Sequence, residues 1–217
     1  GGEFMGEADL WSSNIKLEKS GRITFTLHHG ADTVDICLYT AGEHNVSNAL
    51  CAAAISFAAG ADIEHVQTGL ADFRPPDKRM EMLRAGAGFL LINDTYNANP
   101  ASMTAGLKTL RQMAGRNAVA VIGDMLELGN TAKDAHYSTG KLLAELCIDY
   151  AGVVGEFKED VVRGALDHGF DKQCIRSFAD KDGAGEWINE LVGGKMLGQD
   201  DLVLVKASRG LRFETIV

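Results

Sequence analysis

Short apolar runs alternate with segments whose apolar residues recur every three or four positions, and from Phe89 onward this alternation is regular. Uninterrupted apolar runs suit strands buried on both faces, and the three-to-four spacing suits amphipathic helices. Repeated strand–helix pairs predict an α/β fold with a mainly parallel sheet, right-handed crossovers and helices on both faces. The predicted strands are 89–93, 118–122, 150–154, 175–178 and 201–206, and the predicted helices are 100–113, 131–147, 157–169 and 182–192.

The first third of the chain has a different pattern, without a complete core of its own. Two stretches alternate apolar and polar residues around a segment that contains Gly30, which predicts a hairpin. An alanine-rich stretch that ends at Gly60 predicts a helix, and Pro75-Pro76 interrupts the chain. We therefore expect the end of a domain that begins earlier, with a boundary near residues 83–88. The elements predicted here are strands at 23–27 and 34–38, helices at 45–59 and 63–70, and an extended segment at 80–83.

The overall composition argues against several classes of protein. A content of 46% hydrophobic and 24% charged residues is ordinary for a globular chain of 217 residues. The net charge of −9 argues against non-specific binding to nucleic acid or to an anionic membrane, since both need a basic surface. No apolar run suits a membrane span or a signal peptide, and four scattered cysteines lack metal-ligand spacing. We therefore expect a reducing, cytoplasmic location.

Polar residues gather in three loops that follow predicted strands, at 93–99, 123–129 and 206–209. Because the carboxyl ends of parallel strands share one edge, these loops should meet on the ligand side of the sheet. A carboxylate there could accept hydrogen bonds from a ribose diol, and lysine or arginine could bind phosphate or carboxylate groups. Solvated loop ends are the simpler alternative, but the convergence of three loops favours a ligand site.

Two further places have both a structural and a functional interpretation. Asn45 and Asn48 lie three residues apart at a predicted helix start, where a carboxamide pair could read the edge of an adenine. Capping of that helix by Asn45, with Asn48 in solvent, explains the same spacing and is favoured by it. Arg79 could reach a phosphate, or it could form a surface ion pair with Glu81.

Other motifs are structural or absent. Asn99 is predicted to cap the helix that begins at Pro100, and His65, His136 and His168 are expected on the surface. The sequence contains no GxxxxGK[ST] phosphate loop, no GxGxxG after a strand, and no GxSxG or HExxH motif. The residues alone therefore indicate a two-part α/β protein with a cleft for an anionic ligand.

Five motifs together carry a resemblance to a known family: HNVSNAL (44–50), DKRMEML (77–83), NDTYNANP (93–100), GDMLELG (123–129) and KASRGLRFE (206–214). In this order they resemble the Mur ligases, which form amide bonds in peptidoglycan precursor synthesis. TYNANP and GDMLELG resemble the member that adds D-alanyl-D-alanine to UDP-N-acetylmuramoyl-tripeptide. The resemblance implies the end of a central ATPase domain at 7–84 and a C-terminal Rossmann-like ligase domain at 85–217. Residues 1–6, which begin with GGEF, are expected to be a vector-derived segment or linker.

The resemblance also implies a reaction and its partners. In the family, the terminal carboxylate of the tripeptide is phosphorylated by ATP, and the amine of the dipeptide attacks the acyl phosphate. ATP and Mg²⁺ are the implied cofactors, with the magnesium ligands and the phosphate loop outside the part that this chain resembles. These residues alone are therefore expected to hold no metal and to catalyse no turnover. The implied whole enzyme is a cytoplasmic monomer that neither binds nucleic acid nor enters a membrane.

By resemblance, nine residues match functional positions of the family. Arg79 and Asp94 are the implied catalytic residues, the first at the ATP phosphates and the second at the ribose. Three residues depart from the motifs: Lys78 and Ala207 each replace a glycine, and Asn93 replaces an aspartate. A positive φ at the alanine would be strained. The implied nucleotide-binding residues are Asn45, Asn48, Arg79, Asp94, Tyr96 and Asn97, and the implied substrate-binding residues are Asn97, Lys206, Ser208 and Arg209.

Two other functions stay open from the sequence. A naturally short protein with these motifs could be a non-catalytic nucleotide-binding or scaffold protein. A phospho-receiver-like domain would use Asp94 and Asp124 as an acidic pocket and Lys206 as the phosphate partner. That alternative leaves the first third of the chain unexplained.

Overall fold

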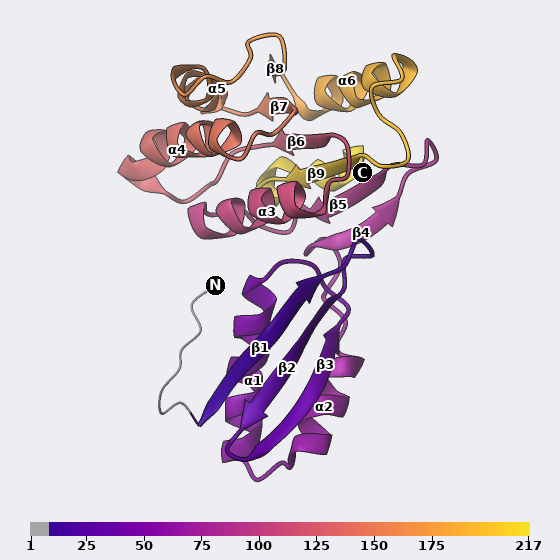
Figure 1. The fold of residues 1–217 in the computed structure, drawn as a ribbon. Helices are drawn as coiled ribbons and strands as arrows, with labels where there is room; N and C mark the ends of the chain where they lie inside the picture. Colours follow the sequence, from indigo (N-terminus) through magenta and orange to yellow (C-terminus); the bar gives the residue numbers. More distant parts are fainter. Residues whose placement is uncertain (1–8) are drawn as a thin grey trace. The chain divides into compact units, whose positions relative to one another are not determined.

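The computed structural model describes residues 9–217 and divides the chain into two compact units between Pro75 and Pro76 (Figure 1). The segment predicted to be vector-derived, residues 1–6, lies outside the described residues. Each unit has its own sheet and its own hydrophobic core.

The first unit consists of β1 (Leu10–Leu17), β2 (Ile23–His29), β3 (Asp32–Leu38), α1 (His44–Ala58) and α2 (Ile63–Asp72). The three strands form an antiparallel sheet in the order β1-β2-β3. The predicted hairpin of β2 and β3 is confirmed, and its tight turn contains Gly30 with a φ of +58°. Glycine suits this position because it adopts positive φ without a steric cost.

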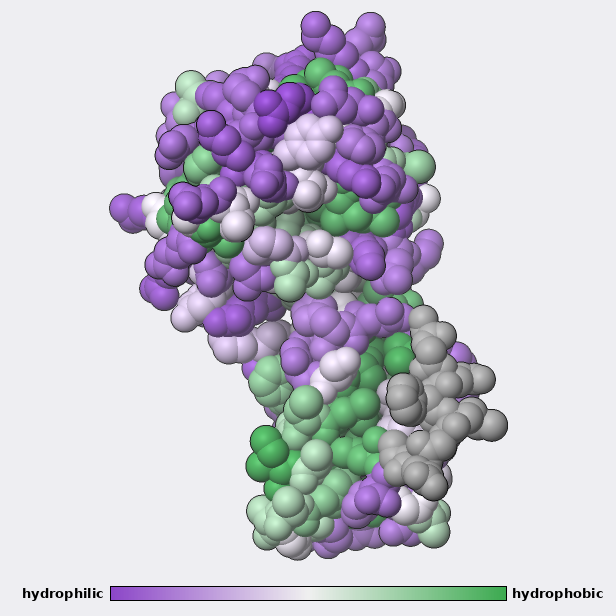
Figure 2. All heavy atoms as spheres, turned by 90° about the vertical axis from the view of Figure 1, so that its left-hand side faces the viewer, coloured by the Kyte–Doolittle hydropathy of each residue, from purple (hydrophilic) through white to green (hydrophobic). Residues whose placement is uncertain are grey.

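The core of the first unit lies between one face of its sheet and the two helices. Ile23, Phe25 and Leu27 alternate along β2 and are almost fully buried there. This part of the chain thus has a hydrophobic cluster of its own, although the sequence shows no complete core pattern here. The sequence did not predict β1, which completes the sheet and packs Leu10 and Leu17 against the same cluster. Figure 2 nevertheless shows hydrophobic residues, in green, over much of the visible face of this unit.

The second unit consists of six strands and four α-helices: β4 (Glu81–Arg84), β5 (Leu90–Asp94), α3 (Pro100–Met113), β6 (Ala118–Ile122), α4 (Ala132–Glu145), β7 (Tyr150–Val154), α5 (Lys158–Asp167), β8 (Ile175–Phe178), α6 (Lys181–Gly193) and β9 (Leu202–Lys206). Short 3₁₀ turns lie at η1 (Gly129–Thr131), η2 (Arg209–Leu211) and η3 (Phe213–Ile216). The predicted strands from β5 onward and the four predicted helices are confirmed, with their ends within two residues. No helix in the described part of the chain is both long and apolar enough to cross a membrane.

The strand order of the second unit, β4-β5-β9-β6-β7-β8, differs from the chain order at β9. From β6 the chain moves outward through β7 to β8, and then β9 returns between β5 and β6, parallel to both. The loops after β5 and β6 lead into α3 and α4, whereas the segment after β9 leads into η3, which packs on α6. In open α/β sheets, ligands bind where neighbouring loops diverge in this way.

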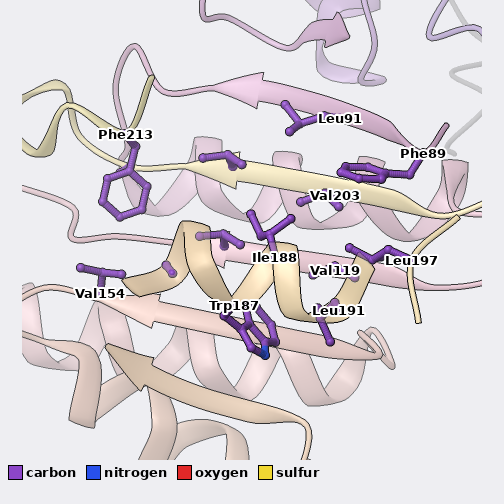
Figure 3. Packing of buried hydrophobic residues seen from close by; sticks show 14 residues of the cluster. Phe89, Leu91, Val119, Val154, Trp187, Ile188, Leu191, Leu197, Val203 and Phe213 are labelled. Carbon is purple, nitrogen blue, oxygen red and sulfur yellow. The ribbon is translucent and has the colours of Figure 1, made fainter. Parts of the chain in front are cut away.

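Helices cover both faces of this sheet, as predicted. Figure 1 shows α3, α4 and α5 on one side of the sheet and α6 on the other. Beneath α6, Trp187 and Ile188 pack on an apolar strand surface that includes Leu91, Val119 and Val203 (Figure 3). Strands buried on both faces read as continuous apolar runs, which explains why the sequence predicted them well.

The division between the units differs from the boundary predicted near residues 83–88. β4 pairs antiparallel with β5, with Glu81 opposite Asn93 and Arg84 opposite Leu90, so it belongs to the sheet of the second unit. A strand of four residues contains no local signal that says which sheet it joins. The double proline marks the division instead.

Candidate functional site

The three polar loops meet at the carboxyl edge of β5, β9 and β6, as predicted. Ser208 joins them: its hydroxyl donates to the carbonyl of Ala98 (3.3 Å) and accepts from the backbone N–H of Leu126 (2.9 Å). The backbone N–H of Ser208 donates to the carbonyl of Asp124 (3.1 Å). Ser208 is buried, and its hydroxyl already donates one hydrogen bond and accepts another within the protein. The loops therefore form one packed assembly.

Two buried charges lie directly beneath this assembly. The Nζ of Lys206 donates to Oδ2 of Asp94 (2.6 Å) and to the carbonyl of Asn97 (3.0 Å). The Oδ1 of Asp94 accepts from the backbone N–H of Met80 (3.2 Å). Removing either partner of a buried pair leaves an uncompensated charge, which is strongly destabilising. Asp94, the implied ribose acceptor, and Lys206, an implied substrate-binding residue, thus bind each other.

Two exposed arginines flank an aromatic ring at the same edge. The guanidinium carbon of Arg79 lies 3.9 Å from the centroid of the Tyr96 ring, and that of Arg209 lies 5.3 Å from it. Asn97, next in the loop, is also exposed. The planar guanidinium forks of both arginines match phosphate and carboxylate groups. This edge is suited to bind an anion on a protein whose net charge is −9.

An unusual backbone turn presents Arg79. Its neighbours Lys78 and Met80 have φ values of +65° and +50°, which side-chain-bearing residues rarely adopt. The backbone N–H of Tyr96 donates to the carbonyl of Lys78 (3.0 Å), and the ammonium group of Lys78 pairs with Glu214 (3.1 Å). Positive φ at two non-glycine positions so close together persists only where surrounding contacts enforce it, and such sites are often functional.

In the first unit, Asn45 and Asn48 lie in the first two turns of α1. Asn45 donates through Nδ2 to the carbonyl of Ala41 (2.7 Å) and to the hydroxyl of Thr40 (3.2 Å), and its side-chain oxygen accepts from Asn48 (3.1 Å). The N-cap of α1 is Glu43, so the capping role considered for Asn45 is wrong. Asn48 is exposed and lines a groove of about 450 Å³ along α1 and α2.

Comparison with known families identifies this arrangement. The model of the Mur ligase glutamate ligase domain matches residues 78–209, which is more than half of the chain. This chain belongs to the Mur ligase family. It is 36% identical over 221 residues to UDP-N-acetylmuramoyl-tripeptide–D-alanyl-D-alanine ligase of Mycobacterium tuberculosis H37Rv, covering 92% of this chain and 42% of that Mur ligase. It is 32% identical over 212 residues to the Escherichia coli K12 protein of the same name, covering 97% and 44%.

Solved Mur ligase structures agree with the fold. Crystal structure I of MurF from Acinetobacter baumannii superposes with a TM-score of 0.85 at 30% identity, covering 97% of this chain and 44% of that one. MurF from Thermotoga maritima in complex with ADP gives a TM-score of 0.78, and at 20% identity it supports the fold alone. The chain therefore spans less than half the length of the Mur ligases that it matches.

The three departures from the Mur ligase motifs have structural explanations. Lys78 adopts the positive φ that the usual glycine would favour. Ala207 does not have a positive φ, so the strain considered for it is absent, and its methyl group is buried against Gly123. Asn93 donates to Glu81 (2.8 Å), which is therefore engaged by an asparagine rather than by an arginine.

One Mur ligase residue that the sequence placed on the surface is buried. His136, on α4, is 2% exposed and stacks on the ring of Phe157. Its Nε2 accepts from the backbone N–H of Met125 (3.0 Å), so Nδ1 carries the proton and donates to the carbonyl of Ala132 (2.7 Å). His136 thus supports the GDMLELG loop. Sequence patterns do not indicate this burial, because the contacts come from Met125 and Phe157 on other segments.

Asp124 of the same loop also has a structural role. Its carboxylate accepts from the backbone N–H groups of Glu156 (2.7 Å) and Phe157 (3.1 Å). Gly155 has a φ of +126°, and a Cβ there would lie 2.3 Å from Asp124. Asp124 therefore clamps the loop after β7. A buried carboxylate held by two N–H groups does not suit the phospho-receiver alternative.

Proposed function

We propose that this chain is part of an ATP-dependent ligase that adds D-alanyl-D-alanine to UDP-N-acetylmuramoyl-tripeptide through an acyl phosphate. The observation that carries this proposal is the grouping of Arg79, Arg209 and Tyr96 at the carboxyl edge of the sheet. Relatives named for that reaction align with more than nine-tenths of the chain. Such an enzyme would act in the cytoplasm as a monomer.

In the proposed site, exposed side chains contact the ligands, and buried side chains hold those exposed side chains in place. Arg79 binds the nucleotide phosphates, Arg209 binds an anionic group of the substrate, and Tyr96 with Asn97 lines the space beside them. Asp94 can still accept from a ribose hydroxyl, because each carboxylate oxygen accepts more than one hydrogen bond. Except at Asp94, which is buried, this division of roles follows the exposure of each side chain.

The first unit contributes a separate set of proposed contacts. Asn48 presents an exposed carboxamide whose orientation is set by Asn45. A carboxamide offers both a donor and an acceptor, which is what the edge of an adenine requires. We propose the pair as adenine contacts of the complete ligase.

The chemistry of the proposed reaction depends on positioning and on stabilising negative charge. ATP, when bound, supplies the phosphoryl group that activates the tripeptide carboxylate. The part that this chain's residues play is to hold anionic groups through fixed guanidinium donors, which need no reorganisation during the reaction. Among the described residues, no three His, Cys, Asp or Glu side chains are grouped to hold a metal ion, so no step through Mg²⁺ is assigned to them.

Nucleotide binding tests the proposal directly. We expect the 217-residue chain to bind ADP in isothermal titration calorimetry, and R79A to weaken that binding about tenfold, because a charge-assisted contact is lost. R163A is the matched control. Arg163, on α5, also lies over a tyrosine ring, that of Tyr137 on α4. Equal affinity of R79A and R163A for ADP would refute the assigned site.

Turnover provides a second test. We expect no phosphate release by these residues in the presence of ATP, tripeptide precursor and dipeptide, because the printed sequence lacks a phosphate loop. Phosphate release that depends on both peptide substrates would contradict this part of the proposal.

A further inference from the structure

A fully buried lysine at the end of β9 differs from the exposed cations around it. Lys206 is 1% exposed, and its ammonium group is held by Asp94 and by the carbonyl of Asn97. We propose that Lys206 is a positioning residue that holds the ligand-facing loops through these two contacts and does not itself touch a ligand. The identity of the ligand rests on the proposed function, but the positioning role does not.

The hydrogen bonds connect Lys206 to both ligand-facing segments. Through Asp94 it reaches the backbone N–H of Met80, which follows Arg79 in the positive-φ turn. Through the carbonyl of Asn97 it holds the loop that carries the Tyr96 ring. One buried ion pair therefore determines where the guanidinium group and the aromatic ring lie relative to each other.

The neighbouring helix leaves room for the lysine stem. At Gly106 of α3, a Cβ would lie 3.3 Å from Cδ of Lys206 and 3.8 Å from Oδ2 of Asp94. The first distance is shorter than an ordinary van der Waals contact, so an alanine would press on the stem. This packing is independent of the hydrogen bonds, and it supports the same role.

Burial separates Lys206 from the groups that bind ligands. Lysine is almost never fully buried unless it is paired, and here the pair lies inside the unit. A phosphate or carboxylate could reach the ammonium group only if the residues that bury it moved aside. Arg79 and Arg209 present their charges at the surface without such a displacement.

The first experiment uses the full chain without any ligand. We expect K206M to shift the NMR amide signals of Met80, Tyr96 and Asn97. G106A should shift the same signals less, and it should fold even if K206M does not, because alanine favours a helix. The matched control is R116M, which removes the cation from a buried aspartate, Asp201, that immediately precedes β9. Unchanged signals in both K206M and G106A, or equal shifts in R116M, would overturn the proposal.

The second experiment separates positioning from direct contact by adding ADP. We expect the ADP titration to move the side-chain signal of Arg79 and to leave the Lys206 ammonium signal in place. K206M should weaken ADP binding about tenfold by misplacing the loops, and K206R should not restore it, because the buried space fits a lysine stem. An ADP-dependent shift of the Lys206 signal would identify Lys206 as a ligand contact, and full ADP affinity in K206M would also overturn the proposal. If the unaltered chain does not bind ADP, the proposed function fails, while the ligand-free spectra still decide the positioning role.

Discussion

Glycines on the helices of the two units have very different surroundings. In the second unit, α4 and α5 approach so closely that a Cβ on Gly140 would lie 1.9 Å from the carbonyl oxygen of Val161, and one on Gly164 would lie 2.0 Å from that of Tyr137. In the first unit, a Cβ on Gly69 of α2 would meet nothing within 4 Å. Glycine is therefore required where helix backbones touch, and it is merely tolerated on an open helix face.

The two sheets also differ in how completely their faces are covered. The second sheet is covered by helices on both faces and has continuous apolar strands. The first sheet buries one face, and the groove along its two helices is lined mainly by apolar residues. The loops of the proposed anion site therefore stand on the more completely packed unit. A rigid support of this kind is what a site that depends on positioning requires.

The largest expected effect comes from the glycine that touches a neighbouring helix. G140A should lower the free energy of unfolding of the second unit by about 3 kcal/mol or more, because the methyl group must force α4 away from α5. The control is G69A, which should raise the stability of the first unit by up to about 1 kcal/mol through helix propensity. Urea unfolding monitored by circular dichroism measures both. Comparable stability losses in the two variants would show that the first unit is packed as tightly as the second.

The second prediction concerns Asp201, a buried carboxylate just before the amino end of β9. The proposed anion site lies at the carboxyl ends of the strands. Burial alone would raise the pKa of Asp201, but hydrogen bonds from Arg116 and from the backbone N–H groups of Asn117 and Gly198 outweigh it and hold that pKa below its usual value. A lowered folded-state pKa contributes stability that is present above the unfolded-state pKa, about 3.9. That stability is lost as the pH falls through the folded-state pKa.

D201N should therefore reduce the free energy of unfolding at pH 7 by about 3 kcal/mol. The difference from the unaltered chain should shrink as the pH falls below about 4. D200N is the control: Asp200 is exposed, and its substitution should change stability by less than about 0.5 kcal/mol. A stability difference for D201N that is constant between pH 7 and pH 3 would show that the carboxylate charge is not responsible.

The sequence predicted best what depends on neighbouring residues. Strands buried on both faces appear as apolar runs, and Asn99 with Ser102 forms the capping box that starts α3. The meeting of the three polar loops followed from parallel strands alone. β1 was missed because a bulge near Asn14, whose φ is +55°, shifts the register and breaks the alternation that marks a strand.

Other features depend on contacts between distant segments, and sequence patterns do not contain them. The insertion of β9 between β5 and β6 brings Lys206 to Asp94, 112 residues away. The burial of His136 depends on Met125 and Phe157. Motif resemblance identified Lys206 and Ser208 as functional positions but gave no information on whether their polar atoms face a ligand or the protein interior.

Matched helix caps provide a smaller and more local test. N99A removes the cap of α3 in the second unit, and D62A removes the cap of α2 in the first, where the Asp62 carboxylate accepts from the N–H of His65 (2.8 Å). Each substitution should cost about 1 kcal/mol. Hydrogen exchange followed residue by residue should place each loss in its own unit. Loss of protection in both units from either variant would show that they unfold together.

The smallest expected effect concerns the open face of α1. Ala52 and Ala53 both line the groove of the first unit, but Ala52 is exposed, whereas Ala53 is 1% exposed and belongs to the core cluster. A52K should change the free energy of unfolding by no more than about 0.5 kcal/mol, because its ammonium group stays in water. A53K should unfold the first unit, because it places an unpaired charge among apolar side chains. Thermal unfolding measures the stability of both variants. A large loss of stability in A52K would mean that other atoms already fill the groove in solution. The pair of variants thus tests whether the first unit leaves open a helix face of the kind that the second unit covers.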